Sequence, residues 1–171
     1  CNLWSGREQD RFRSICRFCD TDFVGTSGER GGRYATAEEL SSVIVSLWPV
    51  GHEENRYVVF TGGEPLLQLD GPLIDAMHSA GFEIETNGTI AVPAGVDWIC
   101  VSPKVGAQLV AKKGNELKVV VPQEGQNLTE YENLSFSHFY VQPMDGENRE
   151  QNVKIAIETC LKNPKWKLGL Q

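Results

Sequence analysis

Short apolar runs alternate with amphipathic segments along most of the chain. The runs are rich in Val, Ile and aromatic residues, a composition typical of buried β-strands. They cover residues 57–60, 82–84, 98–101, 117–121 and 139–141. Because amphipathic segments lie between several of these runs, the pattern predicts a parallel sheet with helices packed against it.

Three segments carry apolar residues at the spacing of an amphipathic helix. The first begins at Thr36, which can form a capping box with Glu39. The second begins near Asp70, with Pro72 in its first turn, and the third begins near Arg149. The positions expected to face the core are Leu40, Val43, Ile44, Leu47 and Trp48 in the first helix, Leu73, Ile74 and Met77 in the second, and Val153, Ala156, Ile157, Cys160 and Leu161 in the third.

Polar residues gather directly after four of the predicted strands. They are Thr-Gly-Gly-Glu-Pro at 61–65, Glu-Thr-Asn-Gly at 85–88, Ser-Pro-Lys at 102–104 and Gln-Pro-Met-Asp at 142–145. The carboxyl ends of parallel strands meet at one edge of a sheet, where α/β proteins bind ligands. Taken singly, these residue types also fit a solvated carboxylate at Glu85, a surface lysine at Lys104 and a loop amide at Gln142, and these interpretations stay open.

Composition narrows the class of protein. The 171 residues, 40% of them hydrophobic, suffice for one domain with a core. The formal net charge of -7 and the lack of a basic run argue against nucleic-acid binding. No segment approaches the roughly 20 consecutive apolar residues of a membrane span. The five cysteines, an odd number, do not suggest a disulfide framework, so we expect a soluble protein of the reducing cytoplasm.

Three cysteines near the start of the chain form the strongest chemical signal. Two residues separate Cys16 from Cys19, which lets both thiolates reach one metal centre, and fourteen separate Cys1 from Cys16. A zinc site would need a fourth ligand, and no second cysteine pair or histidine pair supplies one. A redox pair or a chance spacing are further alternatives. Three cysteines favour an iron–sulfur cluster with one iron left for a non-protein ligand. Cys100 and Cys160 are expected to be buried free thiols.

Together these motifs resemble the radical S-adenosylmethionine (SAM) superfamily and, most closely, its 7-carboxy-7-deazaguanine synthase family. The resemblance spans essentially the whole chain and rests on residues 1–6, 16–23, 61–65, 85–88, 101–104, 115–118 and 141–145. The usual superfamily motif has three residues between its first two cysteines, whereas a subset of these synthases has the long insert found here. Family members also begin with a strand and a Gln-Gly-Glu-Gly turn and end with a Thr-His-Lys segment. Neither is present, so we expect residues 1–171 to be a single radical SAM domain trimmed at both ends.

The resemblance implies a fold, a reaction and partners. The fold is α/β, a partial, open TIM-like barrel of parallel strands with outer helices. The cofactors are a 4Fe-4S cluster, SAM and Mg²⁺. A 5′-deoxyadenosyl radical formed from SAM takes hydrogen from C6 of 6-carboxy-5,6,7,8-tetrahydropterin, whose ring contracts and loses ammonia to give 7-carboxy-7-deazaguanine for queuosine and 7-deazapurine biosynthesis. The implied partners are this pterin, a flavodoxin-type reductant and a second copy of the chain in a homodimer, with neither nucleic acid nor membrane.

The resemblance also assigns site residues, with no catalytic side chain beyond the cofactor ligands. Cys1, Cys16 and Cys19 hold the cluster, Thr21 holds Mg²⁺, and Thr61 contacts the pterin. SAM contacts Phe18, Cys19, Asp20, Gly63, Glu85, Ser102, Pro103, Lys104, Gln142, Pro143, Met144 and Asp145. An alternative for Thr21 is that it only braces the backbone. Alternatives for the whole chain are another radical SAM enzyme, such as a glycyl-radical activase, or a non-enzymatic iron–sulfur or zinc module.

Overall fold

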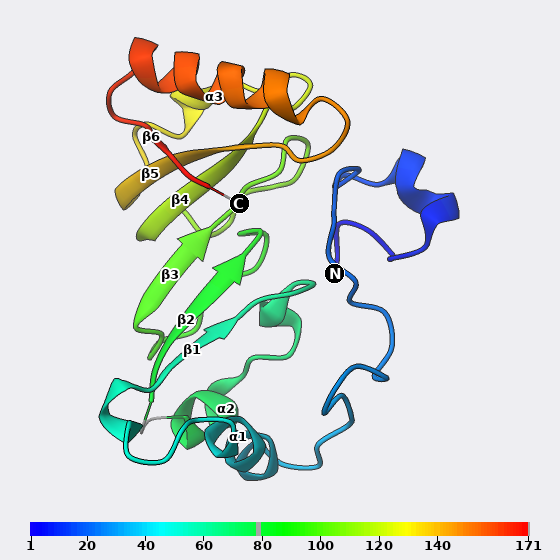
Figure 1. Cartoon of the computed structure of the whole chain (residues 1–171), viewed down its shortest axis with the longest axis vertical. Coiled ribbons are helices and arrows are strands. Elements are labelled where there is room, and N and C mark those ends of the chain that lie inside the picture. Colours follow the sequence, from blue (N-terminus) through cyan, green and yellow to red (C-terminus); the bar gives the residue numbers. More distant parts are fainter. Residues whose placement is uncertain (78–79, 171) are drawn as a thin grey trace.

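One parallel sheet organises the molecule. The computed structural model describes residues 1–77 and 80–170, and within them six strands form a sheet in the order β1 to β6 (Figure 1). All neighbouring strands are parallel, and the sheet is open because β1 and β6 lie at its two edges. The strands are β1 (Tyr57–Phe60), β2 (Gly81–Thr86), β3 (Trp98–Val101), β4 (Lys113–Val121), β5 (Ser135–Pro143) and β6 (Lys167–Leu168). The predicted fold class is thus confirmed.

The five apolar runs all form strands, but pairing extends three of them, β2, β4 and β5, and adds a sixth strand. β4 begins at Lys113 rather than Leu117, because its polar first residues pair with the start of β5. β6 has two residues, which is too short for any periodic pattern, and it forms by pairing with Tyr140 and Val141 of β5. The sequence pattern therefore located the strands but not their full extent.

Three α-helices accompany the sheet, and all three begin as predicted. They are α1 (Ala37–Ser46), α2 (Gly71–Ala76) and α3 (Arg149–Lys162). The Thr36 hydroxyl accepts from the backbone N–H of Glu39 at 3.1 Å, and the Glu39 carboxylate accepts from the N–H of Ala35 at 2.8 Å. Asp70 caps α2 by accepting from the N–H of Leu73 at 3.1 Å. Short 3₁₀ turns complete the element list: η1 (Glu8–Arg13), η2 (Glu53–Asn55), η3 (Pro65–Leu67) and η4 (Leu128–Glu130).

The buried face of α3 is shifted by about one residue from the predicted one. Ile157 and Leu161, expected in the core, are 41% and 77% exposed. The buried positions of this helix are Asn152 and Ala156, because Asn152 turns inward to donate to the carbonyl of Met144. In α1, Leu47 is also exposed, since it follows the last helical residue.

The two faces of the sheet differ in character. Helices α1 and α2 lie at the β1 end and α3 at the β5 end (Figure 1), and two apolar clusters fill the space beneath them. One joins α2 to β2 through Ile74, Met77, Phe82 and Ile84, and the other joins α3 to β4 and β5. Residues at alternate positions face the other way, and the paired rows there are polar: Glu83, Glu85, Trp98, Cys100, Glu116, Lys118, His138 and Tyr140.

The N-terminal segment stands beside the ends to which the arrows of β2 and β3 point (Figure 1, blue). Apart from η1 it has no regular secondary structure up to α1. Within residues 1–77 and 80–170, no helix combines the length and the apolar character needed to cross a membrane. The carboxyl ends of the strands and this segment together enclose the candidate site.

Candidate active site

A cavity of about 360 Å³ lies where the N-terminal segment meets the carboxyl ends of β1 to β5. Every predicted site residue lines it except Pro103 and Pro143, which are flanked in sequence by lining residues. The lining residues are Cys1, Leu3, Cys16, Phe18, Cys19, Asp20, Thr21, Thr61, Gly62, Gly63, Glu85, Thr86, Asn87, Ser102, Lys104, Lys118, Val120, Gln142, Met144, Asp145 and Gly146. The fold thus brings together residues that the sequence separates by more than a hundred positions.

Backbone hydrogen bonds bring the three N-terminal cysteines to one place. The carbonyl of Leu3 accepts from the N–H of Ile15 at 3.2 Å and of Cys16 at 3.3 Å. These bonds close the loop between Cys1 and Cys16, so the long insert does not separate the two thiols. We call residues 1–24, which carry all three cysteines, the cysteine segment.

The cysteine segment is tied to the loops that follow β1 and β2. Asn87 donates through its side-chain amide to the side-chain oxygen of Asn2 at 2.8 Å, and Asn2 donates to the Thr89 hydroxyl at 2.7 Å. A Cβ atom at Gly63 would lie 3.1 Å from the backbone nitrogen of Cys1. Glycine at this position therefore permits the close approach of two backbones beside the cavity.

The spacing of the cysteines suits a cluster better than a single metal ion. Among the described residues, the one group of three or more possible ligands whose atoms all lie within 4.8 Å of one another is Glu83, Glu85 and Cys100. The sulfurs of Cys1, Cys16 and Cys19 therefore do not all lie within 4.8 Å of one another, although the thiols of Cys16 and Cys19 are neighbours. Zinc–sulfur bonds of about 2.3 Å keep the sulfurs of one zinc ion within about 4.6 Å. A polynuclear iron–sulfur cluster bridges a wider set of thiolates.

The electrostatics of Cys16 and Lys104 link the cysteine segment to β3. Burial raises the pKa of Cys16 to about 11; the positive charge of Lys104 acts in the opposite direction, and the neighbouring Cys19 adds to the increase. Burial lowers the pKa of Lys104, and both thiols oppose this change. The Lys104 ammonium donates to the carbonyl and the hydroxyl of Ser102, both at 2.7 Å. Lys104 therefore points into the site and is not a surface lysine.

A buried carboxylate shapes the loop at 61–65. Glu64 is 3% exposed and accepts three hydrogen bonds: from the Thr86 hydroxyl at 2.7 Å, the Asn87 N–H at 2.8 Å and the Leu66 N–H at 3.1 Å. It fastens this loop to the end of β2, which places Gly63 at the cavity wall. Glu64 was not among the predicted site residues, although its position directly after two glycines in the sequence could have indicated a role at the site.

Glu85 is held by two side chains, Lys118 of β4 and Thr61, which directly follows β1. The Lys118 ammonium lies 2.6 Å from one carboxylate oxygen, and the Thr61 hydroxyl donates to the other at 3.3 Å. Burial lowers the pKa of Lys118, but Cys100, Glu85 and Glu116 outweigh it and the pKa is raised overall. Glu85 is thus an oriented and partnered carboxylate. Lys118 was also missed, and the signal was a lysine inside the apolar run 117–121.

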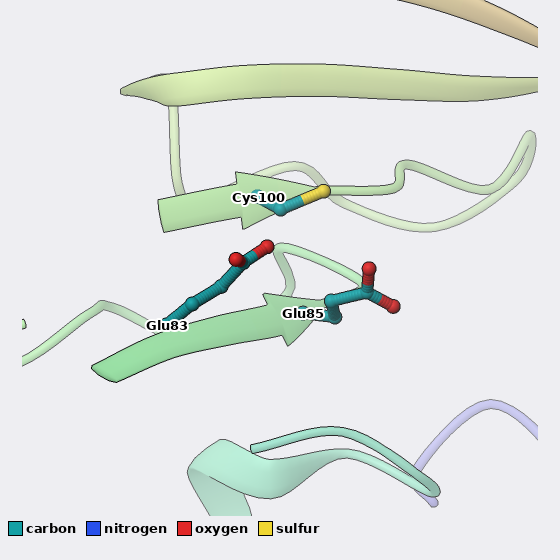
Figure 2. A group of neighbouring side chains, drawn as sticks. All are labelled: Glu83, Glu85 and Cys100. Carbon is teal, nitrogen blue, oxygen red and sulfur yellow. The ribbon is translucent and has the colours of Figure 1, made fainter. Parts of the chain in front are cut away.

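Figure 2 shows Glu83 and Glu85 on β2 beside Cys100 on the adjacent strand β3. Each of the three already has a partner outside the group. The Tyr57 hydroxyl donates to Glu83 at 3.2 Å, the Cys100 thiol donates to Glu116 at 3.6 Å, and Glu85 pairs with Lys118. Burial raises the pKa of Cys100 far above its usual range. The group is therefore a satisfied polar cluster below the cavity, and Cys100 is buried as predicted.

The turn after β5 closes the cavity. Gln142 is buried in β5, so it is not the solvent-exposed loop amide considered as an alternative. The N–H of Met144 donates to the carbonyl of Val121 at 2.8 Å. Asn152 of α3 donates to the Met144 carbonyl, also at 2.8 Å. These bonds fix the turn that presents Met144 and Asp145. Cys160, predicted to be buried, is half-buried on α3 and does not line the cavity.

Thr21 faces the cavity from the cysteine segment, two residues after Cys19. Within the part of the chain that the structure describes, its hydroxyl forms no hydrogen bond to the backbone. A hydroxyl oxygen in this position is a hard donor of the kind that Mg²⁺ prefers.

Comparisons with known proteins complete the description of the site. No protein-family model matches the chain. It is 59% identical over its whole length to the 7-carboxy-7-deazaguanine synthase of Burkholderia multivorans, 56% identical to that of Caulobacter vibrioides and 49% identical to that of Nitratidesulfovibrio vulgaris. In each case the chain covers 82% of the relative's length.

Proposed function

The chain belongs to the 7-carboxy-7-deazaguanine synthase family, and from this premise we propose how its cavity works. The enzyme converts 6-carboxy-5,6,7,8-tetrahydropterin into 7-carboxy-7-deazaguanine with loss of ammonia. The observation that supports this reading most is the convergence of the three N-terminal cysteines and the strand-end residues on one cavity. The relatives' names give no support to a glycyl-radical activase or to a zinc module.

The cysteine segment would hold the 4Fe-4S cluster. Cys1, Cys16 and Cys19 would bind it as thiolates, and the separation of the three sulfurs, which do not all lie within 4.8 Å of one another, supports a cluster over one ion. When bound, the cluster and SAM supply the one-electron chemistry that removes a hydrogen atom from the substrate. Because the pKa of Cys16 is raised by burial, cluster binding displaces a proton from this thiol.

The strand ends would hold SAM and the pterin. Gly63 offers backbone groups to the amino group of SAM. Glu85, kept in place by Lys118 and Thr61, accepts from its ribose hydroxyls. The remaining contacts to SAM come from Phe18, Asp20, Ser102, Pro103, Lys104, Gln142, Pro143, Met144 and Asp145. These groups orient the reactants and exclude water, which is the usual contribution of a protein to cofactor chemistry.

Thr21 and Thr61 would complete the substrate side. The Thr21 hydroxyl binds Mg²⁺, which takes only one or two ligands from protein and leaves positions for the substrate carboxylate and water. Thr61, which also lines the cavity, contacts the pterin. A flavodoxin-type electron donor and a homodimer belong to the same proposal and rest on the family resemblance alone.

Anaerobic turnover tests the proposal. The full-length protein, reconstituted with iron and sulfide, is incubated with SAM, dithionite, Mg²⁺ and the carboxypterin, and the deazaguanine is measured by mass spectrometry. We expect the product only when SAM is present, and none from a Cys16→Ala variant. A cluster-loaded protein that binds SAM but forms no deazaguanine, under conditions in which the Burkholderia relative does, would contradict the assigned reaction.

A further inference from the structure

One arginine of the long insert contacts both the start of the insert and the turn that carries Cys16 and Cys19. Arg11 lies in η1, between Cys1 and Cys16. Its terminal nitrogen Nη1 donates to the carbonyl of Arg17 at 2.9 Å and to the carbonyl of Cys19 at 3.0 Å. Its guanidinium carbon lies 4.0 Å from the ring centre of Trp4. The side chain is 27% exposed, although η1 itself is a surface element.

These contacts connect the three cysteines through one side chain. Trp4 is buried and lies three residues after Cys1, while the two carbonyls belong to the turn that carries Cys16 and Cys19. A planar guanidinium can donate several hydrogen bonds and stack on an aromatic ring at the same time. An ammonium group on a lysine lacks this fixed fork of donors. Arg11 is therefore suited to clamp the turn against the start of the chain.

The ion pair of Arg11 with Glu8 does not explain this arrangement. Its Nε donates to both oxygens of Glu8 at 2.8 Å, but Glu8 is 76% exposed. Exposed pairs of this kind contribute little to stability. Arg13, in the same 3₁₀ turn, shows the ordinary case: it is 73% exposed and lies 4.0 Å from Asp10. The bonds to the carbonyls of Arg17 and Cys19 distinguish Arg11 from this neighbour.

We propose that Arg11 is a positioning residue for the iron–sulfur centre, which clamps the Cys16–Cys19 turn and places a permanent positive charge beside the ligands. This inference rests on the proposed function, because it assumes that the three cysteines hold a cluster. Groups just outside a metal's ligands orient those ligands and tune the metal. Net charge and hydrogen bonds near a cluster set its reduction potential, and a nearby cation stabilises the reduced, more negative state.

The test separates the clamp from the charge. The full-length protein is reconstituted anaerobically as wild type, Arg11→Gln, Arg11→Lys and Arg13→Gln. Two quantities are measured without turnover: the rate at which an iron chelator bleaches the cluster, and the reduction potential from a titration followed by electron paramagnetic resonance. We expect Arg11→Gln to lose its cluster about tenfold faster, the order seen when such outer groups are removed, with a more negative potential.

The two other variants separate the effect of the charge from that of the hydrogen bonds and provide a control. Arg11→Lys keeps the charge without the fork, so its potential should stay near that of the wild type while its cluster is lost faster. Arg13→Gln should match the wild type in both quantities. If Arg11→Gln does not fold, as judged by circular dichroism of the cluster-free protein, the bleaching rate of Arg11→Lys decides the clamp.

Failure of this inference differs from failure of the proposed function. Equal bleaching rates and equal potentials in wild type, Arg11→Gln and Arg13→Gln would overturn the role of Arg11, even if the wild type forms the deazaguanine. A wild type that binds a cluster but forms no deazaguanine would overturn only the reaction, and the comparison of the arginine variants would still decide the clamp. A wild type that binds no cluster would overturn both.

Discussion

The cysteine segment and the strand ends line the same cavity but are held in place by different forces. Of residues 1–24, three are buried: Leu3, Trp4 and Cys16. Polar contacts, such as those of Arg11 and the Leu3 carbonyl, hold the rest. The strand ends continue from a sheet whose core residues, among them Ile84, Leu117 and Val119, are fully buried.

The difference means that the two parts of the site owe their stability to different interactions. Apolar burial of this extent stabilises a structure whether or not a ligand is bound, at roughly 25 cal/mol per Å². A segment held by a few polar bonds gains much of its stability from whatever it binds. The strand ends, which we propose to bind SAM, are therefore preformed, and we expect the stability of the cysteine segment to depend on the cluster proposed for it. Four predictions test this contrast.

The largest effect should come from removing a cluster ligand. Cys16→Ala should abolish the cluster, and amide hydrogen exchange should then accelerate in residues 1–24 while β2 to β5 keep their protection. Mass-spectrometric hydrogen exchange on anaerobic samples measures both regions at once. Cys100→Ala and Cys160→Ala are the matched controls and should keep the cluster. Equal loss of protection in the sheet would show that the two regions are not independent.

Glu64→Gln should give the next largest effect, and it should destabilise the strand ends rather than the cysteine segment. The amide group would place a donor opposite the N–H and O–H groups that the carboxylate now accepts from. We expect a loss of about 2–4 kcal/mol in the free energy of unfolding, since buried donors lose a charged acceptor. Urea unfolding of the cluster-free protein measures it, with the exposed Glu124→Gln as control. A loss of unfolding free energy no larger than that of the control variant would show that Glu64 does not stabilise the loop at 61–65.

Lys118→Met should affect ligand binding more than stability. Without the ammonium, Glu85 keeps only Thr61 as a partner and sits beside Glu83, so its carboxylate is less well placed for the ribose. We expect SAM to bind about tenfold more weakly, the order of one hydrogen bond to a charged group, with the cluster intact. Calorimetric titration measures the affinity, and Lys113→Met, an exposed lysine at the other end of β4, is the control. Unchanged affinity would show that Glu85 does not need Lys118.

Thr21→Ala should give the smallest effect. The variant should keep its cluster and its SAM affinity but lose most of the stimulation of turnover by Mg²⁺, because one of few protein ligands to the ion is gone. Rates at increasing Mg²⁺ measure this, with the exposed Thr26→Ala as control. Full stimulation in Thr21→Ala would show that the hydroxyl does not hold the ion.

The sequence by itself determined the elements whose signals are local. Thr36 and Asp70 mark helix starts because a side-chain oxygen must accept from a free N–H a few residues on. The five apolar runs mark strands because Val, Ile and aromatic residues are frequent in strands that pack at least one face against a core. The spacing of Cys16 and Cys19, together with the polar residues after the strands, was enough to predict residues that line one cavity.

Only the tertiary structure decided the features that depend on distant partners. Lys167 and Leu168 form a strand because β5 offers a free edge, and Leu161 is exposed because Asn152 turns inward toward Met144. Arg11, Glu64 and Lys118 carry no local signal of their partners, since each contacts groups brought close by the fold. A polar side chain finds its role through the donors and acceptors that packing places around it, and those are set by the whole chain rather than by its neighbours in sequence.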